Sequence, residues 1–195
     1  MTIERRFYNV ELRAETDARS ITGYAAVFDS LSQDLGGFRE IIRAGAFARS
    51  LQESPDVFAF WQHDPSRVLG RTTAGTLEVS EDDHGLRFNI SPPDSPTGHD
   101  ALEAVRRGDV SSMSFGFMVE QDRMLKQEDG TILRELLDIH LIEVSPVSFP
   151  AYQATSAEIR SDLQARVAEL TAAPFEPTTD PESLLRELDL EASTA

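Results

Sequence analysis

Hydrophobic and polar residues alternate, or hydrophobic residues gather in short runs, along most of the chain as far as Pro150. Alternation with a period of two residues is typical of β-strands, because successive side chains point to opposite faces of a sheet. The segments with this pattern are 5–13, 20–29, 56–62, 74–80, 84–91, 110–120 and 131–144. The chain is therefore predicted to be mainly β.

Helical patterns are fewer and lie between or after these strands. The predicted helices cover 44–53, 98–107, where Thr97 is the expected cap, 153–171 and 182–191. Turn signals at His84-Gly85 and Asp129-Gly130 join neighbouring strands as hairpins, so most strand pairs are expected to be antiparallel. The pattern thus favours a β-barrel or a curled sheet with peripheral helices.

The composition changes near the C-terminus. Residues 172–181 are rich in Pro and Thr and are predicted to form a linker. From Glu158 onward there are nine acidic residues against three arginines. We therefore expect one folded domain over 1–155, followed by an acidic tail over 156–195 that is helical or flexible and suited to docking on a partner.

The overall charge is strongly negative, with 34 acidic and 18 basic residues and a formal net charge of -16. This balance argues against nucleic-acid binding, because phosphate backbones bind clustered Lys and Arg. The absence of cysteine excludes disulfides, thiolate nucleophiles and cysteine zinc sites. No apolar run reaches the roughly 20 residues that cross a bilayer, and the N-terminal sequence lacks the apolar core of a secretory signal. We expect no membrane association and a cytoplasmic setting.

Ser114 is the first residue that suggests chemistry. Alternation within 110–120 places Phe115 and Phe117 on one face and Ser114 and Gly116 on the other. The small residues of the second face leave room for a substrate beside a hydroxyl, as a nucleophilic hydrolase requires. The alternative is a serine on the solvent-facing side of an ordinary half-buried strand.

His63 is a candidate general base. It ends the apolar run 57–62, and alternation groups it with Trp61. Neutral imidazole can take a proton from a serine hydroxyl near working pH, although a structural histidine would show the same pattern. A metal site built from His63, His99 and His140 lacks any recognised ligand spacing. No metal or cofactor is therefore expected.

Glu143 is the candidate third member of this group. Alternation within 136–143 puts it in one row with Ile139 and Leu141. Burying a carboxylate without a partner costs several kcal/mol, so an imidazolium is its expected partner. The alternatives are a strand end where Glu143 emerges into water, or His140 in the third role.

Several short motifs occur in a characteristic order. They are Gly23-Tyr-Ala-Ala-Val-Phe28, Gly45-Ala-Phe47, Trp61-Gln-His-Asp-Pro65, Val68-Leu-Gly-Arg71, Gly85-Leu86, Ser112-Met-Ser-Phe-Gly-Phe117 and Glu143-Val-Ser-Pro-Val-Ser-Phe-Pro-Ala151. Together they resemble the prohead proteases of tailed phages. The resemblance covers roughly residues 20–155, and the chain past about 160 lies outside it.

This resemblance implies a fold and a set of roles. The fold would be like that of the herpesvirus assemblins, a closed, mostly antiparallel β-barrel ringed by helices, so that 1–155 is the protease domain. Ser114 would be the nucleophile, His63 the general base and Glu143 the residue that orients the imidazole. The assemblins use a second histidine in the third role, which keeps His140 as the alternative.

The resemblance also implies an activity and a setting. The protein would be a serine endopeptidase that needs no cofactor and acts inside the assembling prohead, in the cytoplasm of a bacterial host. Its substrates would be the scaffold protein or the scaffolding segment of the major capsid protein, and the protease itself, whose acidic tail suits an internal cleavage site or an encapsidation signal. Concentration inside the shell leaves a homodimer open by mass action.

Two other functions stay open on the sequence alone. One is a non-catalytic, β-rich scaffold or capsid-binding assembly module that uses the acidic tail as a docking arm. The other is a different hydrolase, such as an esterase. The Gly-x-Ser-x-Gly elbow and the alternating strand–helix pattern of α/β-hydrolases are absent, which argues against the second.

Overall fold

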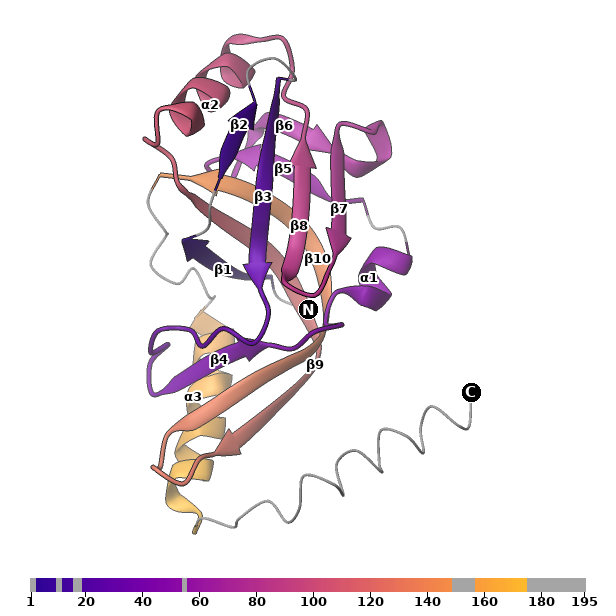
Figure 1. The fold of residues 1–195 in the computed structure, drawn as a ribbon. Helices are drawn as coiled ribbons and strands as arrows, with labels where there is room; N and C mark the ends of the chain where they lie inside the picture. The colour runs from indigo at the N-terminus through magenta and orange to yellow at the C-terminus, as the bar shows by residue number, and fades with distance from the viewer. Residues whose placement is uncertain (1–2, 10–11, 16–18, 54–55, 149–156, 175–195) are drawn as a thin grey trace.

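A computed structural model of the protein describes residues 3–9, 12–15, 19–53, 56–148 and 157–174. They form two β-sheets with helices at the periphery (Figure 1). The larger sheet has six strands in the order β1 (Glu4–Asn9), β9 (Ser112–Lys126), β10 (Ile132–Val147), β5 (Phe58–Trp61) and β6 (Asp64–Arg71), with β4 (Phe38–Ile42) also paired to β10. The smaller sheet has four strands in the order β2 (Arg13–Glu15), β3 (Ser20–Val27), β8 (Gly85–Ile90) and β7 (Leu77–Glu81).

Most of these strands are antiparallel, and the parallel pairings are those of β10 with β4 and with β5. The mainly β fold with peripheral helices is therefore confirmed. The closed barrel that we expected is not found among the described strands. Closure needs hydrogen bonds between the edge strands of the two sheets, and the described strands pair only within their own sheet.

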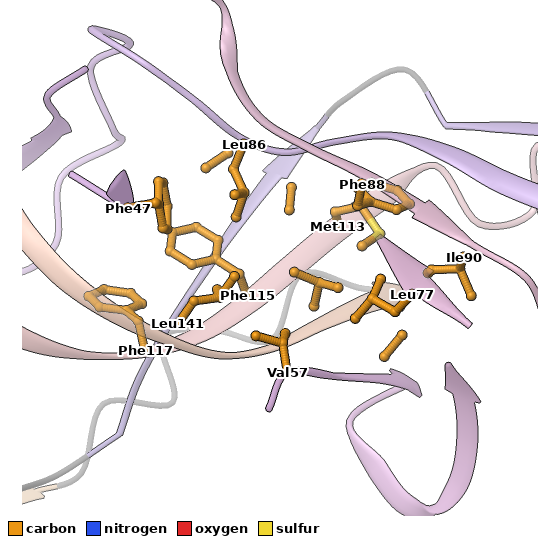
Figure 2. Packing of buried hydrophobic residues seen from close by; sticks show 14 of the residues in the cluster. Phe47, Val57, Leu77, Leu86, Phe88, Ile90, Met113, Phe115, Phe117 and Leu141 are labelled. Carbon is orange, nitrogen blue, oxygen red and sulfur yellow. The ribbon is translucent and has the colours of Figure 1, made fainter. Parts of the chain in front are cut away.

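The two sheets share one hydrophobic core (Figure 2). Phe115 and Phe117 of β9 stack with ring centroids 5.0 Å apart, and Phe47 meets Phe115 edge-on at 5.8 Å. Leu86 and Phe88 of β8 close this core from the smaller sheet. The alternation that placed Phe115 and Phe117 on one buried face is thus confirmed, and it leaves the other face of β9 for Ser114 and Gly116.

One edge of β10 pairs with β9, and several segments form hydrogen bonds with its other edge. β4 pairs with its first residues and β5 with Glu143 and Val144. Between them, the N–H of Ile139 donates to the carbonyl of Ala46 at 2.9 Å, and the N–H of Leu141 donates to Ser50 Oγ at 3.0 Å. Helix α1 (Ala48–Gln52) thus takes the place of a strand here. The ladder between β9 and β10 shifts register nearby.

Two further helices and a 3-10 turn, η1 (Thr72–Ala74), complete the described structure. Helix α2 (Pro96–Arg106) begins at Ser95, whose side chain accepts from the N–H of Gly98 at 3.4 Å. The cap is therefore Ser95 and not Thr97, because Pro96 occupies the first helical position. No helix within the described ranges is long and apolar enough to span a membrane.

Helix α3 (Ala157–Ala172) lies along the far end of the β9–β10 hairpin (Figure 1). Its Leu163 is buried against Phe38 and Ile132 in a second, smaller apolar cluster. Its Arg166 also donates to both oxygens of Asp122, at 3.0 and 2.9 Å. The division of the chain at 155 stays a prediction, but the described part of α3 packs on the sheet. The helix predicted over 182–191 lies outside the described residues.

The sequence pattern does not predict β4 or β6. β6 contains Pro65 and Gly70, which are poor strand residues, and Pro is tolerated there because β6 is the last strand of its sheet. β4 is short and pairs in parallel with β10, so no hairpin turn in the sequence indicates it. The single strand predicted over 5–13 is instead two strands, β1 and β2, that belong to different sheets.

Candidate active site

His63 lies in a tight turn between β5 and β6. Trp61 pairs with Asp64 across the turn, and the two central residues, Gln62 and His63, have φ values of 58° and 61°. Positive φ at both positions is what a type I′ hairpin turn needs, and residues other than glycine adopt it at a cost of about 1–3 kcal/mol each. We expected from alternation that His63 would lie in one row with Trp61. The turn conformation takes it out of that row.

The end of β10 holds this turn in place. The N–H of Gln62 donates to the carbonyl of Pro146 at 3.1 Å. The side-chain amide of Gln62 donates to Ser148 Oγ at 2.7 Å and accepts from the N–H of Ser148 at 3.0 Å. These bonds offset the strain of the turn and direct the imidazole of His63 back toward β10.

Glu143 reaches the site through a β-bulge. Leu141 is paired with Phe117 and Glu143 with Gly116, so that Ile142 is one extra residue on β10. A bulge re-aims the side chains that follow it. Glu143 consequently lies on the face opposite to Leu141, and the single row that we expected for these two residues is wrong.

Gly116 provides the space for the Glu143 side chain. A Cβ atom added at position 116 would lie 2.7 Å from Cγ of Glu143 and 3.1 Å from its Oε1. The first distance is shorter than real contacts allow, so any larger residue would push Glu143 away. The small face of β9 therefore accommodates a carboxylate from the neighbouring strand.

Both carboxylate oxygens of Glu143 are engaged. Oε1 accepts from Arg5 Nε at 2.7 Å and lies 3.1 Å from His63 Nδ1. Oε2 accepts from Ser145 Oγ at 3.0 Å. Burial works to raise the pKa of Glu143, but the hydrogen bonds and positive charges of His63 and Arg5 outweigh it and lower this pKa to about 2. The buried group is therefore an ionised carboxylate.

This carboxylate favours the tautomer of His63 that carries its hydrogen on Nδ1. The other ring nitrogen, Nε2, is buried and has no hydrogen-bond partner among the described residues. Buried polar atoms without a partner are uncommon in folded proteins and call for an explanation. In this tautomer Nε2 is a free acceptor, which is the state that a general base requires.

Ser114 lies on the same face of β9 as Gly116. It is opposite Ser145 on β10 and opposite Phe7 on β1, and it is 3% exposed. Its hydroxyl donates to the backbone carbonyl of Arg6 at 3.0 Å. The structure thus brings His63 and Glu143 into contact and places Ser114 on the adjoining strand, with its hydroxyl turned toward β1.

The other histidines lie in different surroundings. His140 is half-buried on the sheet face that carries Glu143, opposite Met118. The Glu143 carboxylate is bonded by His63, Arg5 and Ser145. His99 is exposed, with Nε2 2.8 Å from Asp94 Oδ1. Within the described ranges, no three His, Asp or Glu side chains are grouped as metal ligands.

Three contacts of the site were not expected from the sequence. Arg5 comes from a strand more than a hundred residues away in the chain, and no local signal marks it. Ser145 and Gly116 could have been found, since both belong to the motifs around Glu143 and Ser114. Their significance depends on the register between β9 and β10, which alternation alone does not provide.

A family model described as caudovirus prohead serine protease matches residues 8–169 of the chain. The protein belongs to this family. The family resemblance expected from the motifs is confirmed, and the match extends past 160 into α3, further than we expected. The protein is a serine protease, so the non-catalytic module is not supported.

The fold was also similar to one solved structure, that of the bacteriophage T4 capsid assembly protease, gp21. The two chains are 8% identical, with a TM-score of 0.44 over 74% of this chain and 98% of that chain. No curated protein matches the chain.

Proposed function

We propose that this protease cleaves the scaffold protein, or the scaffolding segment of the major capsid protein, during prohead maturation. Membership of the prohead protease family supports this role. The reaction would take place inside the assembling prohead, in the cytoplasm of the bacterial host. The substrate is then an internal peptide bond of another assembly protein, and the enzyme is an endopeptidase.

We further propose that His63, Ser114 and Glu143 form the catalytic triad. The observation that carries this proposal is the 3.1 Å contact between His63 Nδ1 and Glu143 Oε1, while Nε2 is buried without a hydrogen-bond partner in the part of the chain that the structure describes. The hydroxyl of Ser114 is on the neighbouring strand and needs to turn from the Arg6 carbonyl to that nitrogen. Rotation about one side-chain bond changes the direction of a serine hydroxyl.

The reaction then follows the usual course for a serine nucleophile. Ser114 Oγ attacks the peptide carbonyl carbon while His63 Nε2 takes its proton, and Glu143 stabilises the imidazolium. The imidazolium returns the proton to the leaving amine as the C–N bond breaks, which leaves an acyl-enzyme. Water, deprotonated by His63, attacks the ester carbonyl and releases the acid and the free hydroxyl.

Two experiments test these roles. A fluorophosphonate probe, which phosphonylates activated serines, should label Ser114 of the wild type, and mass spectrometry locates the adduct. Co-expression with the capsid protein should give a shortened capsid product that Ser114→Ala and His63→Ala abolish. Glu143→Gln should be impaired less than either.

Particular results would contradict the assignment. Equal shortening of the capsid protein by the wild type and by Ser114→Ala would exclude Ser114 as the nucleophile. If His140→Ala is damaging and Glu143→Gln is harmless, the third role belongs to His140.

Three further expectations belong to this proposal. The acidic tail is a site of self-cleavage or an encapsidation signal, which mass spectrometry of the incubated protein tests. A homodimer forms at the high concentration inside the shell, which light scattering over a concentration series tests. The assemblin-like architecture stays a prediction of the family resemblance, which an experimental structure of the protease tests.

A further inference from the structure

Arg5, Gly116 and Glu143 form one row across three neighbouring strands of the larger sheet. Arg5 on β1 is opposite Gly116, and Gly116 is opposite Glu143 on β10. Adjacent strands lie about 4.8 Å apart, so roughly 9.6 Å separates the backbones of β1 and β10. The two side chains cover this distance together: that of Glu143 lies over Gly116, and Arg5 Nε meets its Oε1 at 2.7 Å. They can do so because position 116 has no side chain in between.

We propose that Arg5 is a positioning residue of the protease, which holds the Glu143 carboxylate in the orientation that meets His63. The proposal rests on the proposed triad of His63, Ser114 and Glu143. Arg5 Nε and His63 Nδ1 converge on the same oxygen, Oε1, while Ser145 takes Oε2. With donors on both oxygens, the carboxylate is fixed in rotation, and the imidazole has one defined partner.

The burial of the partners gives this contact its strength. The side chain of Arg5 is 37% exposed, but that of Glu143 is only 3% exposed. An ion pair between two exposed groups contributes little, because water and salt screen it. Here the carboxylate end of the pair is shielded from water, so removing Arg5 would leave a buried anion with one cationic partner fewer.

β1 is itself anchored on the opposite side of Arg5. Arg6 donates to Glu40 Oε1 at 2.7 Å and to Glu4 Oε2 at 2.7 Å, and Arg134 bonds to the same two carboxylates at 2.8 and 3.0 Å. All four side chains are buried. This cluster fixes the backbone of β1 on both sides of residue 5, which limits where the Arg5 side chain can reach.

Arg5 also has an electrostatic effect that a purely structural residue would lack. Among the described residues, Arg5 from β1, His63 from the turn and Ser145 from β10 bond to the Glu143 carboxylate, and Gly116 of β9 and Phe58 of β5 are its partners in register. Arg5 is the permanent cation of this set. It therefore opposes the addition of a second positive charge when His63 takes up a proton.

The test measures the rate of fluorophosphonate labelling at Ser114 between about pH 5 and 9. In Arg5→Gln, we expect the rate on the high-pH plateau to fall about tenfold, because the carboxylate loses its orientation. The acid limb of the profile should move to higher pH by about half a unit or more. Arg5→Lys should keep the position of the limb, since it keeps the charge. Arg87→Gln, an exposed arginine on the smaller sheet, is the matched control and should leave the profile unchanged.

The outcomes separate this inference from the proposed triad. A wild-type profile in Arg5→Gln would overturn the role of Arg5 while leaving the triad intact. A lower plateau without any movement of the acid limb, together with a lower thermal unfolding midpoint, would show a structural effect only and would also overturn it. If the probe does not label Ser114 in the wild type at any pH, the proposed triad fails, and this inference fails with it.

Discussion

At the scale of single residues, Glu143 links stability to pH. Its ordinary pKa is 4.5, and burial works to raise it, but His63 and Arg5 lower the pKa of the folded protein to about 2. The ionised form is therefore favoured by folding. Its contribution to stability is complete above about pH 5 and is lost as the pH falls toward 2. The difference in pKa corresponds to about 3 kcal/mol.

This linkage predicts the behaviour of Glu143→Gln. The difference in unfolding free energy between wild type and variant should be largest near neutral pH and should shrink as the pH falls from about 5 to 3. Denaturant unfolding at a series of pH values measures it. A difference that is constant over this range would mean that the carboxylate is not stabilised by its neighbours.

The close contact between Gly116 and Glu143 leads to a second prediction at this scale. Gly116→Ala places a methyl group 2.7 Å from Glu143 Cγ, so it should destabilise the fold by about 1–3 kcal/mol and slow the labelling of Ser114. In a Glu143→Ala background the same change should cost less, because the clashing side chain is absent. Equal costs in the two backgrounds, measured as a double-mutant cycle, would contradict the proposed clash.

At the scale of secondary-structure elements, the turn between β5 and β6 stores backbone strain. Gln62→Gly and Gln62→Ala both remove the bonds of the side chain to Ser148. Glycine alone suits the φ of 58° at this position. We therefore expect the glycine variant to be more stable than the alanine variant by about 1 kcal/mol in denaturant unfolding. Equal stabilities would show that the turn is not strained.

The buried ion cluster is the other element-scale feature with a measurable consequence. Arg134→Met removes a partner from Glu4 and Glu40 and leaves uncompensated charge in the interior. We expect a loss of about 3–5 kcal/mol in the free energy of unfolding. Arg106→Met is the matched control, because Arg106 and Glu103 are both 52% exposed. It should cost less than about 1 kcal/mol.

At the scale of the whole molecule, α3 ties the C-terminal part of the described chain to the sheet. A chain that ends at Pro174 keeps the contacts of Leu163, Arg166 and the carbonyl of Ala173. A chain that ends at 155 loses them and exposes Phe38 and Ile132. We expect the shorter chain to be less stable by at least about 2 kcal/mol and prone to aggregate. Equal stability would support the domain boundary that the composition predicted.

The sequence predicted part of this molecule well. Alternation identified the buried face of β9 through Phe115 and Phe117, because one face of that strand packs against a core. The turn residues marked the β7–β8 and β9–β10 hairpins, where the conformations are local. The sequence-based prediction was wrong for β6 and for the closed barrel. Edge strands carry weak sequence signals, and sheet closure depends on pairings between distant segments.

The candidate site shows the same division. The residue types and their order along the chain were enough to select His63, Ser114 and Glu143 as candidates. The sequence misplaced two of them, because a period of two residues assumes an uninterrupted strand. The extra residue Ile142 shifts Glu143 to the other face, and the positive φ of His63 turns it out of its row.

By itself, the sequence determined most of the strand segments, the apolar face of β9 and the chemical groups that are available, since these depend on short-range periodicity and side-chain chemistry. Only the tertiary structure decided that the side chain of Glu143 lies over Gly116 and meets Arg5 of β1, and that a buried ion cluster holds β1 in place. Such contacts depend on strand order, register and burial, which arise when segments far apart in the chain pack together.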